Sequence, residues 1–266
     1  MVERTSGRRL GALLTAAALT RAATAALRAR PPGGPERWTR TNHAGRHVEL
    51  YAGPAAAFGA TVGVTALPAT PRAAAALAVL AAGACGVYDD MAGRDDPRRG
   101  FRAHLGALRD GEVTSGAVKL FGISAAGLVA GSLLKERALD KVLAGVVIAG
   151  TAHLVNLVDV RPGRAGALVL ALGAPGLLRE GPGAVVAASS MGAAAAVLPD
   201  DLGERAMIGD AGAHALGAAL GSAIAAGNGR VGLAVHAAAL VAAAVYGEEV
   251  SSVAAYGGQV LRGSSP

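Results

Sequence analysis

Aromatic side chains and charges are both scarce in this sequence. Of its 266 residues, 3% are aromatic and 17% are charged, whereas about a quarter of the residues in an ordinary soluble domain are charged. A large soluble, alanine-rich helical protein is therefore a poor explanation, because too many successive windows lack a polar face. The single cysteine, Cys85, lies inside an apolar run, which excludes a disulfide framework and a cysteine metal site.

What the chain does contain is a series of apolar runs rich in Ala, Val, Leu and Gly. Runs of about 20 residues match the hydrocarbon thickness of a bilayer, and small residues let helices pack closely in lipid. The sequence therefore predicts an all-α, polytopic transmembrane bundle that forms one domain over residues 1–266, with a tail from about residue 250 to 266. We expect nine spans, at about residues 10–27, 50–68, 73–89, 114–134, 138–158, 165–179, 183–199, 209–226 and 231–247.

The first predicted span contains Arg21. An arginine near mid-bilayer costs about 2.5–3.5 kcal/mol on insertion scales, unless it snorkels or faces the bundle interior. A secretory signal peptide is the alternative for this segment, but no small-residue cleavage site with a polar mature domain follows it.

The basic residues indicate an orientation. The loops after the first and third predicted spans are rich in arginine, and such loops are typically cytosolic. Alternation then predicts an N-terminus outside, a cytosolic C-terminus and a cleft that faces the cytosol, in a cell (inner) membrane protein. The formal net charge of +6 follows this topology, and without a basic stripe or interleaved aromatics it does not indicate a nucleic-acid partner.

Acidic residues mark the predicted cytosolic ends of three spans. Asp89 and Asp90 end one span, Asp159 follows Asn156 at the end of another, and Asp210 opens a third. Carboxylate and amide oxygens are hard ligands that suit Mg²⁺ or Mn²⁺. These residues therefore predict a site for a divalent metal ion at the cytosolic ends of the spans.

The alternative is that acidic residues simply cap helix ends. We favour it for Asp200, Asp201 and Glu204. It does not explain the adjacent pair Asp89–Asp90 at a helix C-terminus, where the helix dipole is unfavourable to anions and neighbouring carboxylates repel each other.

Lys119 is a second candidate, about a turn and a half into a predicted span. An ionisable residue at that depth is a functional candidate by default, and a lysine there could pair with a phosphate. Simple snorkelling to the interface is the alternative.

A polar segment precedes the second predicted span. Its Asn42-His43-Ala44-Gly45 stretch has the composition of a turn, and Asn42, His43 and Arg46 are well placed for the cleft. A plain solvated linker is an equal alternative.

Four motifs resemble those of the polyprenyl-phosphate N-acetylhexosamine-1-phosphate transferases, the MraY and WecA superfamily. In chain order they are Asp89-Asp90, the segment Thr114–Lys119, Asn156-Leu157-Val158-Asp159, and Met207-Ile208-Gly209-Asp210-Ala211-Gly212-Ala213. The resemblance extends from about residue 37 to 255. It implies membrane helices around a cytosolic-facing cleft and Mg²⁺-dependent chemistry in cell-wall or glycopolymer synthesis.

The implied reaction transfers a sugar-1-phosphate from a soluble UDP-sugar to undecaprenyl or decaprenyl phosphate, releasing UMP. By the resemblance, Asp89, Asp90 and Asp210 are catalytic residues and metal ligands. Asp210 would bind Mg²⁺, and Asp89 or Asp90 would activate or position the lipid phosphate or help to hold the metal. The nucleotide side would be lined by Asn156 and Asp159, and Lys119 would contact phosphate. A homodimer is a further expectation.

The sequence also departs from the family pattern. The lysine expected two residues after the aspartate pair is absent, and no histidine-rich loop occurs late in the chain. The Asp-Gly-Leu-Asp-Gly-Leu-Ala segment that the family has after Asn156-Leu157-Val158 loses one acidic residue here and gains Arg161 and Arg164. We predict that these arginines replace the positive charge of the missing histidines and bind substrate, since arginine pairs with phosphate through two hydrogen bonds.

Three other functions remain open at this stage. A CDP-alcohol phosphatidyltransferase also clusters aspartates, but its signature is not met after Asp159. A divergent homologue could serve as a membrane scaffold or lipid-handling partner. A transporter would carry broken helices at mid-membrane, whereas the acidic groups here lie at predicted span ends.

Overall fold

The structure is a computed structural model that describes residues 2–93, 98 and 100–260. The described part contains eleven α-helices, one 3-10 turn (η1) and one two-stranded hairpin. Their bounds are α1 Val2–Ala29, η1 Pro35–Trp38, β1 Thr39–Thr41, β2 His47–Glu49, α2 Ala52–Gly63, α3 Ala69–Ala92, α4 Gly100–Arg109, α5 Ser115–Leu134, α6 Ala138–Val158, α7 Arg164–Leu177, α8 Pro182–Leu202, α9 Gly209–Gly227, α10 Arg230–Val245 and α11 Gly247–Val260.

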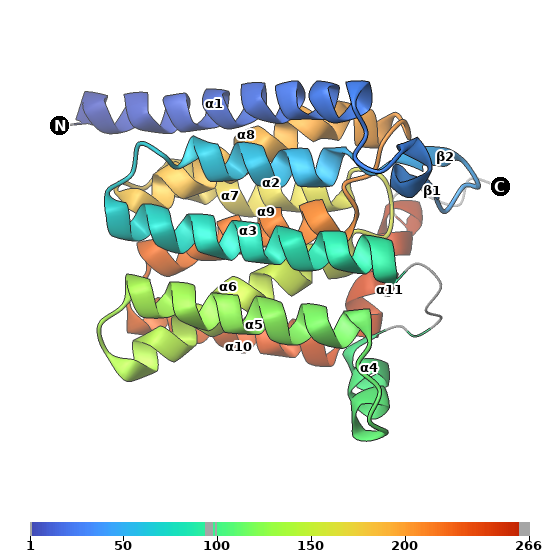
Figure 1. Cartoon of the computed structure of the whole chain (residues 1–266). Helices are drawn as coiled ribbons and strands as arrows, with labels where there is room; N and C mark the ends of the chain where they lie inside the picture. Colours follow the sequence, from blue (N-terminus) through green and yellow to red (C-terminus); the bar gives the residue numbers. More distant parts are fainter. Residues whose placement is uncertain (1, 94–97, 99, 261–266) are drawn as a thin grey trace.

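The longer helices run side by side and form a bundle (Figure 1). Helix α4 projects from one end of this bundle, next to the start of α5, and the hairpin β1–β2 lies at the same end (Figure 1). We call this the hairpin end. The opposite end carries the short connections α2–α3, α5–α6, α7–α8 and α9–α10. The connecting loops therefore alternate between the two ends (Figure 1), and the membrane orientation of these ends stays a prediction.

Each of the nine predicted spans coincides with a helix, but the helices differ in length. Five are long and apolar enough to cross a membrane: residues 6–29 of α1, and α3, α5, α6 and α8. Helices α10 and α11, bent by 82° at their junction, qualify together as a sixth span. Helices α2 and α7 have 12 and 14 residues, short of the roughly 20 residues that a straight span needs. A helical membrane protein is supported, and nine spans remain a prediction.

Two of the helices were not predicted. Helix α4 lies between two predicted spans, and α11 continues to Val260, inside the segment expected to be a tail. Both helices are short, and neither is by itself an apolar run of membrane length. Such runs were the pattern from which the spans were predicted.

Helix α9 is the centre of the bundle. Most of its residues, from Gly209 to Ala225, are buried, and it packs against α3, α6 and α8. Small residues make this possible, because a Cβ atom on Gly86 of α3 would lie 2.5 Å from the Cα of Ala211. The two backbones therefore approach more closely than any side chain would allow, as is common between membrane helices.

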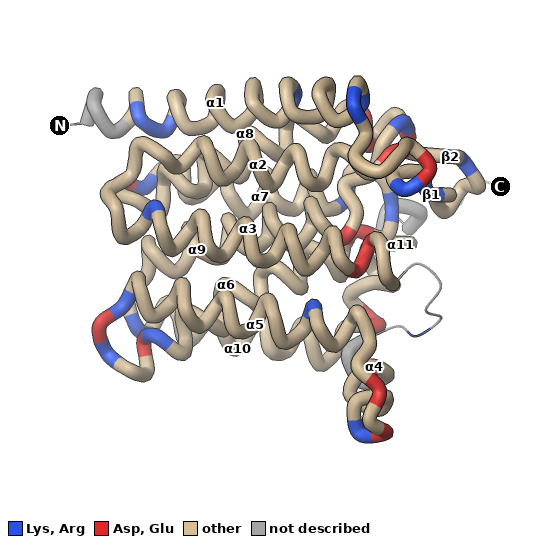
Figure 2. The backbone as a smooth tube through the Cα atoms, in the orientation of Figure 1, with Lys and Arg blue, Asp and Glu red and all other residues tan. Residues whose placement is uncertain are grey.

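Charged residues gather at the two ends of the bundle and are sparse between them (Figure 2). This distribution is typical of a chain whose middle is surrounded by hydrocarbon.

The polar segment before α2 folds as the hairpin. Strands β1 and β2 pair antiparallel, with Arg40 opposite Val48. Between them, the Asn42 side-chain oxygen accepts hydrogen bonds from the backbone N–H groups of Ala44 and Arg46, both at 2.9 Å. The predicted turn is therefore confirmed, and the segment is not a plain linker.

Candidate functional site

The end of α3 meets the start of α9 through Asp90. Its carboxylate accepts hydrogen bonds from the backbone N–H groups of Asp210, at 3.1 Å, and Ala211, at 3.0 Å. Gly209 makes the approach possible: its φ is +56°, and a Cβ there would lie 3.0 Å from the carboxylate oxygens of Asp90. Because N–H groups and the helix dipole at a helix N-terminus favour anions, α9 compensates for the unfavourable position of Asp90 at the end of α3.

A lysine from a third helix balances the other two carboxylates. Lys119 Nζ of α5 lies 2.6 Å from Asp89 Oδ2 and also contacts Asp210 Oδ2. The three side chains are 15%, 18% and 26% exposed, in the order Lys119, Asp89, Asp210. Simple snorkelling therefore does not describe Lys119. Its ammonium group connects α3, α5 and α9 through a mostly buried network of ion pairs.

These groups line a cavity of about 390 Å³ at the hairpin end. Asn156, from the last turn of α6, also lines it. The complete lining is Arg40, Thr41, Leu50, Asp89, Asp90, Gly93, Arg98, His104, Ser115, Lys119, Asn156, Met207 and Asp210. Five of the predicted site residues thus lie around one cavity, although they come from four helices.

A smaller cavity of about 150 Å³ adjoins it, since Thr41 and Met207 line both. The smaller cavity contains the predicted residues Asn42, Asp159 and Arg161. Burial raises the pKa of Asp159 well above its usual value, and the nearby carboxylates of Asp201, Asp210 and Asp90 raise it further. Three acidic residues, Asp159, Asp201 and Glu204, therefore line the smaller cavity.

Two predicted substrate-binding residues lie apart from both cavities. Among the described residues, neither lining includes Arg46 or Arg164. Arg46 Nε lies 3.6 Å from Glu204 Oε2, and Arg164 begins α7. His43, in contrast, lines the smaller cavity.

The acidic residues that we had assigned to helix capping have more specific partners. Asp201 accepts a hydrogen bond of 2.7 Å from the backbone N–H of Gly163, and therefore caps the start of α7. Glu204 accepts a hydrogen bond from the Asn42 side chain at 2.7 Å. Asp200 lies among three arginines and is described below.

Three cationic or basic residues of the larger cavity were not predicted: Arg40, Arg98 and His104. Arg40 donates a hydrogen bond to the Asp90 backbone oxygen, and Arg98 forms a bidentate pair with Glu112 at 2.7 and 2.8 Å. They lie on elements that we had treated as loops, so no periodic pattern indicated them.

His104 comes from the unpredicted helix α4. Its Nδ1 lies 2.9 Å from the Thr114 hydroxyl oxygen, which also accepts a hydrogen bond from the Ala117 backbone N–H at the start of α5. The ring packs against Gly116, where a Cβ would lie 2.5 Å from the ring carbons of His104. Thr114 and Gly116 therefore form the contact site of His104 on α5, and both belong to the segment that resembles the family motif.

The carboxylates of Asp89 and Asp210 are oxygen donors of the kind that Mg²⁺ binds, and in this structure both contact Lys119. Among the described residues, no group of three or more His, Cys, Asp and Glu is arranged to hold a metal ion. Mg²⁺ is commonly held by one or two carboxylates together with substrate phosphates. Asp89 and Asp210 would supply the carboxylates. Asp90 fits less well, because both of its oxygens already accept backbone hydrogen bonds.

Comparison with known proteins adds no relative: no protein-family model matches the chain, and no curated protein sequence matches it. The fold and the site define a helical protein with several helices of membrane length and a carboxylate–lysine cluster in a cavity at one end of its bundle.

Proposed function

We propose that this protein is a membrane glycosyl-1-phosphate transferase. It would transfer a sugar-1-phosphate from a UDP-sugar to undecaprenyl or decaprenyl phosphate, release UMP, depend on Mg²⁺ or Mn²⁺, and serve cell-wall or glycopolymer synthesis at the cytosolic face of the cell membrane. The observation that carries the proposal is the pairing of Lys119 with Asp89 and Asp210 inside a cavity of about 390 Å³.

The charges around this cavity support a bound divalent cation. Three carboxylates and three fixed cations line it, and one of those cations, Arg98, is paired with Glu112. The cavity thus has no surplus positive charge for two polyanionic substrates, which repel each other. When bound, Mg²⁺ would supply that charge and stabilise the transferring phosphate.

The chain's own residues would orient the reactants. The reaction forms a bond between an oxygen of the lipid phosphate and the sugar-bearing phosphorus, and breaks the bond from that phosphorus to the bridging oxygen, whose electron pair leaves with UMP. The attacking oxygen is already ionised, so no proton transfer is required. Lys119 would contact the phosphates, and Asp90 would fix the start of α9, so that Asp210 faces the reacting groups.

The smaller cavity suits the nucleotide side of the donor. It adjoins the carboxylate–lysine cluster and offers amide, carboxyl and guanidinium groups from Asn42, Asp159 and Arg161. A protonated Asp159, favoured by its raised pKa, could donate a hydrogen bond to an uncharged base. The alternative function, a scaffold or lipid-handling partner, keeps the same fold but needs no donor.

A release assay tests the proposal. Purified full-length protein with Mg²⁺, undecaprenyl phosphate and a panel of UDP-sugars should release UMP. Asp210→Asn should lower the rate at least about 100-fold, since a catalytic metal contributes several kcal/mol to transition-state stabilisation.

The matched control is Asp140→Asn. This residue also pairs with a cation, Arg230, but at the opposite end of the bundle, and its variant should retain the wild-type rate. If folded wild-type protein releases no UMP with any donor, the proposal is wrong and the scaffold function is favoured.

A further inference from the structure

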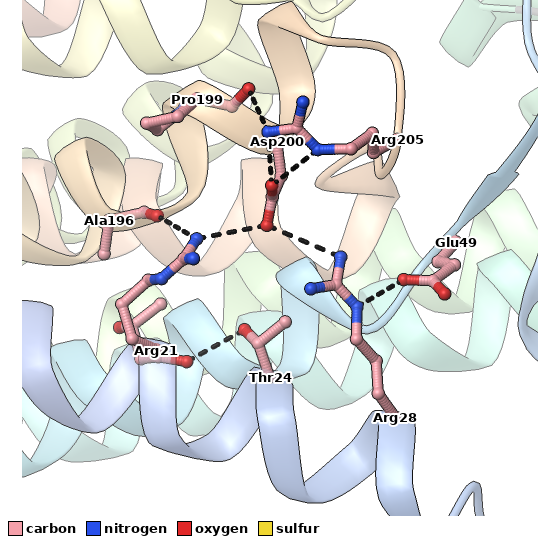
Figure 3. Close-up of polar contacts among 9 residues, drawn as sticks. Arg21, Thr24, Arg28, Glu49, Ala196, Pro199, Asp200 and Arg205 are labelled. Carbon is pink, nitrogen blue, oxygen red and sulfur yellow. Dashed lines mark hydrogen bonds and ion pairs between the residues drawn. The ribbon is translucent and has the colours of Figure 1, made fainter.

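A second polar cluster lies on the outside of the bundle, where α1 packs against α8. Asp200, near the end of α8, is 6% exposed and is surrounded by three arginines (Figure 3). Its oxygens lie 3.1 Å from Arg21 Nη1, 3.4 Å from Arg28 Nη2 and 2.7 Å from Arg205 Nη2. One buried carboxylate thus holds three guanidinium groups in one place.

The guanidinium groups are more accessible than the acid beneath them. The side chains of Arg21 and Arg205 are 55% and 61% exposed, and that of Arg28 is 34% exposed. Glu49 pairs with Arg28 at 2.5 Å, so three positive charges face two negative ones. The cluster therefore keeps a surplus positive charge on its outer side.

The three arginines also carry more N–H donors than the described residues accept. Each guanidinium carries five N–H donors, and the described residues accept fewer than half of those in the three groups. Because Asp200 already orders the side chains, a further acceptor would bind with little additional loss of side-chain entropy. Phosphate oxygens suit such a fork of donors, since guanidinium groups bind phosphate through pairs of hydrogen bonds.

The position of the cluster along α1 indicates where such a phosphate would come from. Leu14, Arg21 and Arg28 are spaced by seven residues and lie on one face of α1. Leu14 is 56% exposed, so this face changes from apolar to basic toward the hairpin end. Arg21 and Arg28 are about 10 Å apart along the helix axis, and both lie in the half of α1 nearer the hairpin end.

We propose that Arg21, Arg28 and Arg205 form a binding site for a phosphate group, supplied by the headgroup of an anionic phospholipid that lies against α1 and α8. The site is separate from the carboxylate–lysine cluster, and it does not depend on the proposed transferase activity. Its ligand would be a structural lipid that ties α1 to α8 at the membrane surface.

Lipid titration of the full-length protein in detergent tests this site. Phosphatidylglycerol should raise the unfolding temperature of the wild type, and native mass spectrometry should give its apparent Kd. Arg21→Gln combined with Arg205→Gln should weaken that Kd by about fivefold for each arginine removed. Arg205→Gln alone should weaken it about fivefold, whereas Arg137→Gln, an equal charge loss in the exposed α5–α6 connection at the opposite end, should leave it unchanged.

Two further arms separate the source of the phosphate. Phosphatidylcholine should bind at least tenfold more weakly than phosphatidylglycerol, and inorganic phosphate at the same concentration should not reproduce the stabilisation. If phosphate alone stabilises as well as the lipid does, the lipid assignment is overturned. An unchanged phosphatidylglycerol Kd in the double variant overturns the site itself. Should the double variant not fold, Arg205→Gln alone, the most exposed of the three arginines, provides the same comparison.

Discussion

At the scale of single residues, the hairpin end accommodates several neighbouring carboxylates by different means. Asp89 and Asp210 share the ammonium group of Lys119. Asp90 accepts two backbone N–H groups at the start of α9. Asp159 has a raised pKa because burial and its acidic neighbours disfavour its charged form. Adjacent acids are tolerated here because each has a different compensating group or is readily protonated.

Asp159 gives a prediction on pH and stability. Its pKa is raised in the folded state, so wild-type stability falls as pH rises from the usual value of 3.8 through the folded pKa, because the folded protein must then charge a buried acid. Asp159→Asn removes this penalty. In thermal unfolding with a chelator present, the variant should match the wild type at about pH 4 and be more stable at about pH 8. A difference that stays constant or reverses sign with pH would contradict this account.

At the scale of elements, the crossing of α3 and α9 positions the whole cluster. Gly86→Ala should force the two helices apart, because its Cβ would meet the backbone of Ala211 at 2.5 Å. We expect a loss of about 1–3 kcal/mol in unfolding free energy, which is typical of overpacking, together with loss of UMP release.

The control for this variant is one turn away on the same helix. At Gly83 the nearest atom to an added Cβ is the Ala57 Cβ, at 3.1 Å, and a shift of a few tenths of an ångström would relieve this contact. Gly83→Ala should therefore destabilise clearly less than Gly86→Ala. Equal effects of the two variants would show that the close approach of α3 and α9 does not hold the site.

Helix α4 depends on a different glycine. Gly116→Ala should displace the His104 ring from its contact with Thr114, since the new Cβ would lie 2.5 Å from the imidazole carbons. Hydrogen exchange should become faster across α4, and the KM of the donor should rise, because His104 lines the larger cavity. Gly106→Ala within α4 meets nothing within 4 Å and should slow exchange or leave it unchanged. Unaltered exchange in Gly116→Ala would argue against the contact of His104 with Thr114 and Gly116.

At the scale of the whole molecule, the predicted topology places the two ends of the bundle on opposite sides of a membrane. In a Cys85→Ala background, His43→Cys at the hairpin end should react with an impermeant thiol reagent only from the cytosolic side. Arg137→Cys, in the α5–α6 connection, should react only from outside. Labelling of both positions from the same side would contradict the alternating spans.

A feature of this structure could be predicted only where it leaves a local pattern in the sequence. Long apolar runs predicted α1, α3, α5, α6 and α8, because bilayer thickness sets the length of a membrane-spanning helix. The grouping of Asp89, Asp90, Lys119, Asn156 and Asp210 was also predicted, since alternation places all these helix ends together. Arg40 and His104 were missed because β1 and α4 are short elements without a membrane-length pattern.

The sequence by itself determined a helical chain with apolar runs of membrane length, and it placed its chemistry-bearing acids at helix ends, because composition and run length are local properties. Only the tertiary structure decided which groups meet. Lys119 reaches Asp89 and Asp210, and Arg21 meets Asp200 across some 180 positions of the chain, because glycine and alanine contacts set how closely the helices approach. Pairing between distant residues depends on that packing, which no local pattern records.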